Sequence, residues 1–267
     1  MWESPTPNII EPLFFAPLDA YPAAGMFTTP HLISLVVCLI ILLVALKASL
    51  KKSWEQVMKL TRVIAIVVTI LEGVKIAYNF YYGYTWLDAW FPLSFCSLFI
   101  YATWFSGFGK GAIKKVGDAF IVMGCLLGGI GFLLLPTTSL MRYPIWHFLC
   151  LYSLFFHMLM IYLSVLYLWH RCVPINRYTY VYFSVYFLIS ALICIGLNTI
   201  YDSNLMILRE PYNVPFKFIQ EIKAQSQMAY TCLATLAYLI GPGLFAFGIS
   251  AWLKAKKVNN QTSDFSY

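Results

Sequence analysis

The chain has 267 residues, of which 61% are hydrophobic and only 11% are charged, and its formal net charge is +7. A soluble domain carries about 25% charged residues, so this composition excludes a globular protein whose whole surface faces water. The positive residues stand between apolar stretches and form no basic domain, which argues against a nucleic-acid partner and indicates orientation in a membrane.

Seven stretches are close to the roughly 20 apolar residues that a membrane-spanning helix needs. In chain order they cover residues 31–50, 60–82, 89–107, 116–136, 145–169, 178–200 and 229–253. The fourth contains Gly124, Gly128, Gly129 and Gly131, and small residues at this spacing allow close helix contact. The sequence therefore predicts an all-α polytopic membrane protein, with an N-terminal segment 1–30, a seven-helix domain 31–253 and a tail 254–267.

The distribution of lysine and arginine over the loops predicts the orientation. Thirteen of them fall on one side of the predicted spans, and four (Arg142, Arg209, Lys217 and Lys223) fall on the other. Because cytoplasmic loops are enriched in positive residues, we expect a multi-pass cell-membrane protein with its N-terminus outside and its C-terminus in the cytoplasm. The first 29 residues have no basic start, so we expect the first span to be an uncleaved anchor.

The cysteines and histidines form no pattern typical of a disulfide framework or a metal site. Six of the seven cysteines lie in predicted spans, and Cys172 lies in a predicted cytoplasmic loop. No C-x-x-C, no nucleotide-binding glycine motif and no lysine in the last span for retinal occur. We therefore expect no metal and no cofactor, and the sequence carries no signal of an oligomeric state.

Polar residues inside the spans gather in the half predicted to face outward. They are His31, Glu72, Lys75, Asn79, Ser94, Cys96, Ser97, His147, His157 and Asn198, and Asn204 follows in the long outer connection. Polar groups in a span usually face the bundle interior. The pattern predicts a polar cavity open to the outer leaflet, with substrate-binding candidates His31, Glu72, Lys75, Asn79, His147, Asn198 and Asn204.

Most of these residues also have a structural interpretation. Glu72 and Lys75 share a helix face and can neutralise each other. His31 and His147 stand at predicted helix ends, where an interfacial histidine is ordinary, and a buried cysteine behaves as a small hydrophobe. His157 differs, because it lies near the middle of a span, where an imidazole needs a partner or water.

Cys96 and His157 are the best candidates for chemistry. A thiolate is a nucleophile, and a neighbouring histidine can take the thiol proton. Counted at about 1.5 Å per residue from Trp90 and Trp146, Cys96 lies roughly 9 Å deep and His157 roughly 16 Å deep. The two depths differ by several ångströms, so His147 is the alternative base.

Three segments carry a resemblance to a known family. They are FPLSFCSLFIY (91–101), the span WHFLCLYSLFFHMLMIYLSVLYL around His157, and GLNTIYDSNLMILREP (196–211). With His31, they resemble the bacterial YwaF-like membrane proteins, which are similar to a eukaryotic family of seven-span ether-phospholipid acyltransferases. The resemblance runs from about Phe27 to Phe247.

The resemblance implies a catalytic pair. In the eukaryotic family, a cysteine in the third span and a histidine in the fifth are catalytic, and by motif they correspond to Cys96 and His157. This implies acyl transfer from a phospholipid to Cys96 and then to a lysophospholipid, with His157 as the base. The chain departs from the bacterial pattern at Ser94, where a histidine is usual, and at Leu205, where an aromatic residue is usual.

Two functions are compatible with these observations. The first is a membrane-embedded lipid acyltransferase or acyl hydrolase whose partners are membrane lipids. The second is a transporter or small-molecule receptor in which Glu72, Lys75 and His157 bind substrate or carry protons. Replacing Cys96 distinguishes them, because only the first requires a nucleophile.

Overall fold

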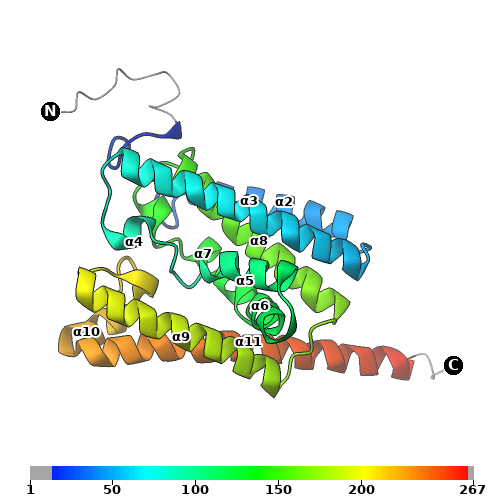
Figure 1. The fold of residues 1–267 in the computed structure, drawn as a ribbon. Helices are drawn as coiled ribbons and strands as arrows, with labels where there is room; N and C mark the ends of the chain where they lie inside the picture. Colours follow the sequence, from blue (N-terminus) through cyan, green and yellow to red (C-terminus); the bar gives the residue numbers. More distant parts are fainter. Residues whose placement is uncertain (1–13, 264–267) are drawn as a thin grey trace.

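The computed structural model describes residues 14–263, with side chains up to Trp252. Figure 1 shows that this part is helical, and no strand occurs in it. The first 13 residues of the predicted N-terminal segment and residues 264–267 of the predicted tail lie outside it. The helices are α2 (Thr29–Ser49), α3 (Trp54–Tyr81), α4 (Leu87–Trp90), α5 (Leu98–Phe108), α6 (Gly111–Met123), α7 (Cys125–Leu134), α8 (Phe148–His170), α9 (Arg177–Tyr201), α10 (Lys217–Gln225) and α11 (Gln227–Ser263), with 3₁₀ turns η1 (Ser139–Met141) and η2 (Leu205–Ile207).

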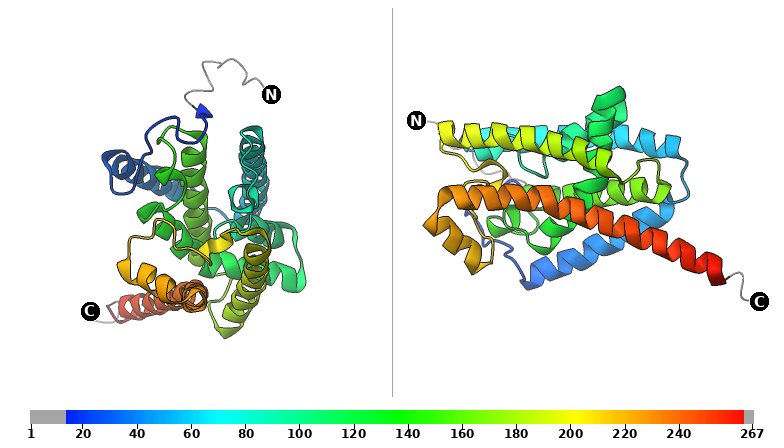
Figure 2. Two further views of the ribbon diagram at one scale, coloured as in Figure 1. Left: turned by 90° about the vertical axis from the view of Figure 1, so that its left-hand side faces the viewer. Right: turned by 90° about the horizontal axis from the view of Figure 1, so that it is seen from below.

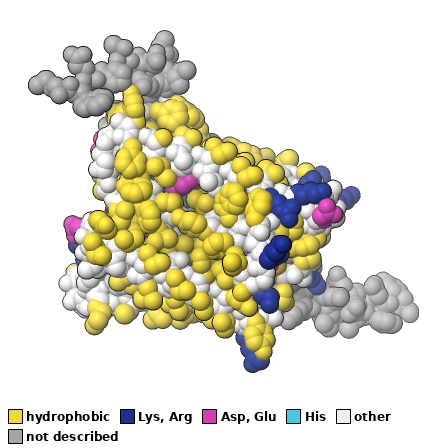
Figure 3. Space-filling view, viewed as in Figure 1, with side chains coloured by type: hydrophobic (Ala, Val, Ile, Leu, Met, Phe, Trp, Pro, Cys, Tyr) yellow, Lys and Arg dark blue, Asp and Glu magenta, His cyan; other side chains and the backbone are white. Residues whose placement is uncertain are grey.

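Five helical segments are long and apolar enough to cross a membrane. They are α2, the segment Gly111–Met141 that contains α6 and α7, α8, α9 and the part of α11 up to Trp252. Large apolar side chains on α2 and α9 are exposed, and Figure 3 shows an apolar surface with lysine and arginine gathered at one end. The all-helical membrane protein is thereby confirmed, whereas the count of seven spans stays a prediction, because α3 and α5 are not among the five.

The third predicted span is not one continuous helix. It consists of the short α4, an irregular segment 91–97, and α5, which has only 11 residues. Phe91 takes an extended conformation with ψ of 122°, because the residue before a proline, here Pro92, is disfavoured in the α region. Cys96 consequently lies in a turn before α5, and the depth that we counted along a helix does not apply to it.

The fourth predicted span also consists of two helices. α6 ends at Met123, and α7 begins after Gly124. α7 packs closely along α8, which also contacts α2, α3 and α6. Figures 1 and 2 show α2 and α3 on one side of this central group and α9, α10 and α11 on the other. The site described below lies where α7 and α8 face the irregular segment 91–97.

Gly129 sets the closest approach of α7 to α8. A Cβ atom there would lie 2.6 Å from Cγ1 of Ile161 and 2.8 Å from the carbonyl oxygen of His157. We expect Gly129→Ala to lower the free energy of unfolding by about 1–3 kcal/mol, because the backbone of α8 must move to admit the methyl group. Thermal unfolding in a neutral detergent measures this loss.

Gly131 provides the matched control for this substitution. A Cβ atom at Gly131 meets nothing within 4 Å, and alanine favours a helix over glycine by roughly 1 kcal/mol. Gly131→Ala should therefore leave stability unchanged or raise it. Equal losses for the two variants would show that helix contact at Gly129 is not tight.

Candidate functional site

One cavity of about 650 Å³ lies between α3, the segment 91–97, α7, α8, the loop 204–214 and α11. Its size lies in the usual range of roughly 300–1,000 Å³ for small-molecule pockets. α7 and α11 contribute an apolar wall, which consists of Leu127, Phe132, Leu233, Ala237 and Tyr238. Arg142, Tyr212 and Asn213 line the cavity and are also exposed, so we call their side the mouth.

The structure brings six of the nine sequence-predicted site residues to this cavity. Those that line it are Glu72, Lys75, Asn79, Cys96, His157 and Asn204. His31, His147 and Asn198 do not. The fold thus brings these six polar side chains to one cavity wall.

Cys96 is a half-buried free thiol with no hydrogen bond to any described residue. Its turn is held by Ser94, whose Oγ accepts from the backbone N–H of Ser97 at 3.1 Å and lies 2.8 Å from Ser97 Oγ. The turn 94–97 forms part of the cavity wall and presents Cys96 there.

His157 offers one free ring nitrogen. Its Nδ1 lies 2.6 Å from the carbonyl oxygen of Ser153, one turn earlier on α8. A carbonyl only accepts, so Nδ1 carries the hydrogen, and Nε2 keeps a lone pair. Nε2 is buried without a hydrogen-bond partner, and the ring stacks on Phe132 with centroids 3.7 Å apart. The imidazole is thus fixed in position with an acceptor atom available, as a general base requires.

Glu72 and Lys75 neutralise each other in the cavity wall. Nζ of Lys75 lies 2.6 Å from Oε1 of Glu72, and the hydroxyl of Tyr152 donates to Oε2 at 2.6 Å. Oε1 thus takes part in the ion pair, although it accepts no hydrogen bond, and Oε2 accepts one, which favours the structural interpretation of this pair. Asn79 donates from Nδ2 to the Lys75 carbonyl at 2.8 Å. Tyr152 was not among the sequence candidates, because a tyrosine in an aromatic-rich span carries no distinguishing signal.

Asn198 and Asn204 shape the loop beside the cavity. Oδ1 of Asn198 accepts from the backbone N–H of Leu205 at 2.7 Å, and Oδ1 of Asn204 accepts from the N–H of Arg209 at 2.9 Å. Two residues after Asn204, Met206 has a φ of 58°, in the left-handed region that is unfavourable for side-chain-bearing residues. The two amides hold this backbone in place. Only Asn204 lines the cavity, and Asn198 supports the loop through its hydrogen bonds.

His31 and His147 are also placed away from the cavity by structural hydrogen bonds. Nε2 of His31 lies 2.9 Å from the Leu133 carbonyl, and its Nδ1 accepts from the N–H of Phe27. Nε2 of His147 lies 3.0 Å from the Ala16 carbonyl, and its Nδ1 accepts the N–H of Leu149 at the start of α8. Both nitrogens of each ring are occupied. His147 is therefore unsuited to be the alternative base.

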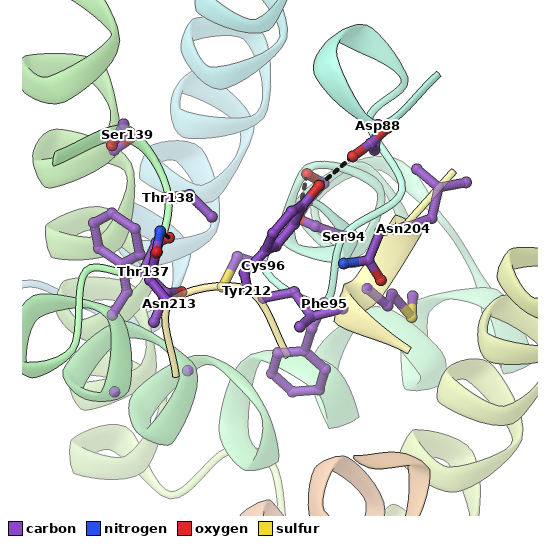
Figure 4. A pocket seen from close by; sticks show the side chains of 18 of the residues that line it. Asp88, Ser94, Phe95, Cys96, Thr137, Thr138, Ser139, Asn204, Tyr212 and Asn213 are labelled. Atoms are coloured by element: carbon purple, nitrogen blue, oxygen red, sulfur yellow. Dashed lines mark hydrogen bonds between the residues drawn. The ribbon is translucent and has the colours of Figure 1, made fainter. Parts of the chain in front are cut away.

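The mouth contains residues that the sequence did not single out as site candidates. Figure 4 shows Tyr212 between Asp88 and the stretch Thr137–Ser139, and its hydroxyl donates to Oδ2 of Asp88 at 2.5 Å. Partial burial, and secondarily the Asp88 carboxylate, raises the pKa of Tyr212 to about 12, so the phenol remains a donor at neutral pH. Nδ2 of Asn213 donates to the Thr137 carbonyl at 3.1 Å. These bonds hold the loop 209–214 across the mouth.

The cavity wall carries a thiol, an imidazole and apolar side chains together. Among the described residues, no three His, Cys, Asp or Glu side chains lie close enough to hold a metal ion. A thiol, an imidazole with a free acceptor and an apolar wall are instead the groups that acyl transfer from an amphiphile requires. Tyr152, Asp88, Arg142 and Tyr212 add polar contacts around them.

Comparison with known proteins gives one match. The sequence model of the TMEM164 family matches residues 26–245, which include every residue that lines the cavity. No curated protein and no solved structure matches the chain.

Proposed function

The chain belongs to the TMEM164 family of membrane proteins, and we propose that it is a membrane-embedded lipid acyltransferase or acyl hydrolase with Cys96 as nucleophile and His157 as general base. The observation that carries the proposal is that Cys96, a free thiol, and His157, whose Nε2 has no hydrogen-bond partner among the described residues, line one cavity that also has an apolar wall. The resemblance to the YwaF-like proteins and the eukaryotic acyltransferases, which selects the same two residues, supports it.

The proposed reaction has two steps. In the first, Nε2 of His157 takes the Cys96 proton, and the thiolate attacks the carbonyl carbon of a phospholipid acyl ester. The ester C–O bond breaks, the lysophospholipid oxygen receives the proton from His157, and a thioester remains on Cys96. In the second, a lysophospholipid hydroxyl or water gives its proton to His157 and attacks the thioester carbonyl carbon. The C–S bond breaks, and the Cys96 thiolate takes the proton back from His157. The apolar wall would hold the acyl chain.

We also propose seven spans in the cell membrane, with the N-terminus outside and the C-terminus in the cytoplasm. The excess of thirteen lysines and arginines over four on the other side supports this orientation. α5 alone, at about 1.5 Å per residue, is too short for a bilayer core of roughly 30 Å. α4, the segment 91–97 and α5 would together form one broken span, the form that membrane proteins use where a helix lines a site.

Trapping the thioester tests the proposal. The full-length protein is reconstituted in phosphatidylcholine vesicles whose acyl chains carry an alkyne, quenched in acid, and analysed by mass spectrometry. We expect a hydroxylamine-sensitive acyl group on Cys96 that is absent in Cys96→Ser. Cys232→Ala, which removes an exposed thiol outside the cavity, should retain it.

The alternative function predicts a different outcome. A transporter or receptor that uses the same cavity has no need of a nucleophile, so Cys96→Ser should leave its ligand binding intact, and no thioester should form. Absence of acylated Cys96 after prolonged incubation with the labelled lipid, in protein whose fold is intact, would overturn the enzymatic proposal.

A further inference from the structure

Arg142 is a cation at the mouth of the cavity. We propose that its guanidinium binds the phosphate of the amphiphile that enters the cavity. The proposal deepens the proposed function, because it names the group by which a lipid substrate is held. It concerns binding alone, so it can be tested without any acyl transfer.

Among the described residues, Arg142 is the one cation of the cavity wall that has no carboxylate partner. Four charged residues line the wall: Glu72, Lys75, Asp88 and Arg142. Lys75 is paired with Glu72, and Asp88 accepts the hydroxyl of Tyr212. Among the described side chains, no carboxylate lies within 4 Å of the Arg142 guanidinium, which instead lies 6.0 Å from the centroid of the Tyr212 ring. The wall therefore offers an attraction for an anion at this point.

Hydroxyl groups accompany the cation. Thr137, Thr138 and Ser139 line the cavity just before Arg142. Figure 4 shows these three residues on the side of the cavity across from Asp88. Phosphate oxygens accept several hydrogen bonds, and a guanidinium can donate two parallel ones to a phosphate. A cation with adjacent hydroxyl donors is the chemistry that recognises a phosphate group.

The apolar wall indicates that this phosphate belongs to a lipid. Free inorganic phosphate would use the mouth alone and leave the apolar wall of α7 and α11 unoccupied. An amphiphile would place its headgroup beside Arg142 and its chains along Phe132 and Tyr238. Burial of the chains adds to its affinity, so a phospholipid should bind more tightly than phosphate alone.

Ligand binding to the purified full-length protein in a neutral detergent tests the inference. The probe is a phosphatidylglycerol with two six-carbon chains joined by ether bonds, so that it has no acyl group to transfer. Fluorescence of Trp86, which lines the cavity, reports binding. Charge-assisted hydrogen bonds are the strongest of their class, so we expect Arg142→Gln to weaken binding roughly 10- to 100-fold. Arg142→Lys should fall between this variant and the original chain.

A matched control separates a specific contact from general surface charge. Lys217 on α10 is exposed, takes part in no ion pair among the described residues and does not line the cavity. Lys217→Gln should bind the probe as the original chain does, and the matching ether lipid without a phosphate should be insensitive to Arg142→Gln. Equal weakening by both substitutions, or inorganic phosphate that competes as strongly as the lipid, would overturn the inference. Neither outcome depends on whether Cys96 becomes acylated.

Discussion

Replacing His157 with glutamine is expected to slow formation of the Cys96 thioester by roughly 10²- to 10⁴-fold, the usual contribution of a positioned general base. The geometry gives the reason. Nδ1 is held by the Ser153 carbonyl and the ring is stacked on Phe132, so Nε2 is the nitrogen left to take a proton. Glutamine can still donate to a carbonyl, but its amide cannot act as a base at neutral pH.

His170 is the matched control for this substitution. It is the last residue of α8, does not line the cavity, and also has a buried Nε2 without a hydrogen-bond partner among the described residues. Acylation rates of reconstituted His157→Gln and His170→Gln are compared per folded molecule, with folding followed by size-exclusion chromatography. A rate for His157→Gln within about threefold of the His170→Gln rate would remove His157 from the mechanism.

The membrane character of the protein and its polar cavity could be predicted from the sequence because both follow from one-dimensional patterns. Apolar stretches about 20 residues long indicate helices in lipid. Polar residues within them, such as Glu72 and His157, tend to face inward because lipid offers no hydrogen bonds. Together, these two rules predict that the polar side chains of the spans face a common interior, and six of the nine candidates line the cavity.

The roles of His31, His147 and Asn198 could not be predicted in the same way. Each is buried and polar, but its partners are backbone groups such as the carbonyls of Leu133, Ala16 and Leu205. Every residue has a backbone carbonyl, so a sequence does not indicate which carbonyl will accept a hydrogen bond from these side chains. The contact of His147 with Ala16 joins residues 131 positions apart, which only the tertiary fold determines.

A local signal was available for the break before α5. Pro92 restricts the residue before it, which makes a continuous helix across 89–107 unfavourable. The mean hydropathy of a stretch of residues does not depend on this restriction. Hydropathy alone therefore predicts one continuous helix over residues 89–107. The structure places Cys96 in the resulting turn, where its depth depends on the path of the irregular backbone rather than on a fixed rise per residue.

The sequence also did not indicate a buried polar network. This network lies at the end of the bundle away from the mouth. Oδ1 of Asp118 accepts from Ser106 Oγ at 2.6 Å and from Lys114 Nζ at 2.9 Å. The hydroxyl of Tyr167 lies 2.7 Å from Ser106 Oγ and 3.1 Å from Thr61 Oγ1. These side chains join α3, α5, α6 and α8, and none of them lines the cavity. Lys114 and Asp118 are one helical turn apart, and this spacing is the indication of an ion pair that the sequence contains.

We expect Asp118→Ala to lower the free energy of unfolding by about 3 kcal/mol, near the lower limit for breaking a buried ion pair. Lys114 remains about one-third exposed, with 32% of its side chain accessible, which limits the loss. Ser106 would lose its carboxylate acceptor. Asp118→Asn should cost less, because the amide oxygen can still accept from Ser106. Unfolding in mixed micelles with increasing sodium dodecyl sulfate measures these differences.

The exposed pair Glu55–Lys59 is the control for this prediction, because it distinguishes the effect of burial on stability from the effect of charge. It has the same spacing of four residues and a similar distance of 3.0 Å, but its side chains are 79% and 67% exposed. Exposed pairs contribute about 0–1 kcal/mol, so Glu55→Ala should have little effect. If the two alanine variants lose equal stability, the network does not hold the four helices together. Asp118→Ala should instead unfold more easily than Glu55→Ala, while its folded fraction acylates Cys96 at the normal rate. This result would show that the network around Asp118 stabilises the bundle and takes no part in the acylation of Cys96.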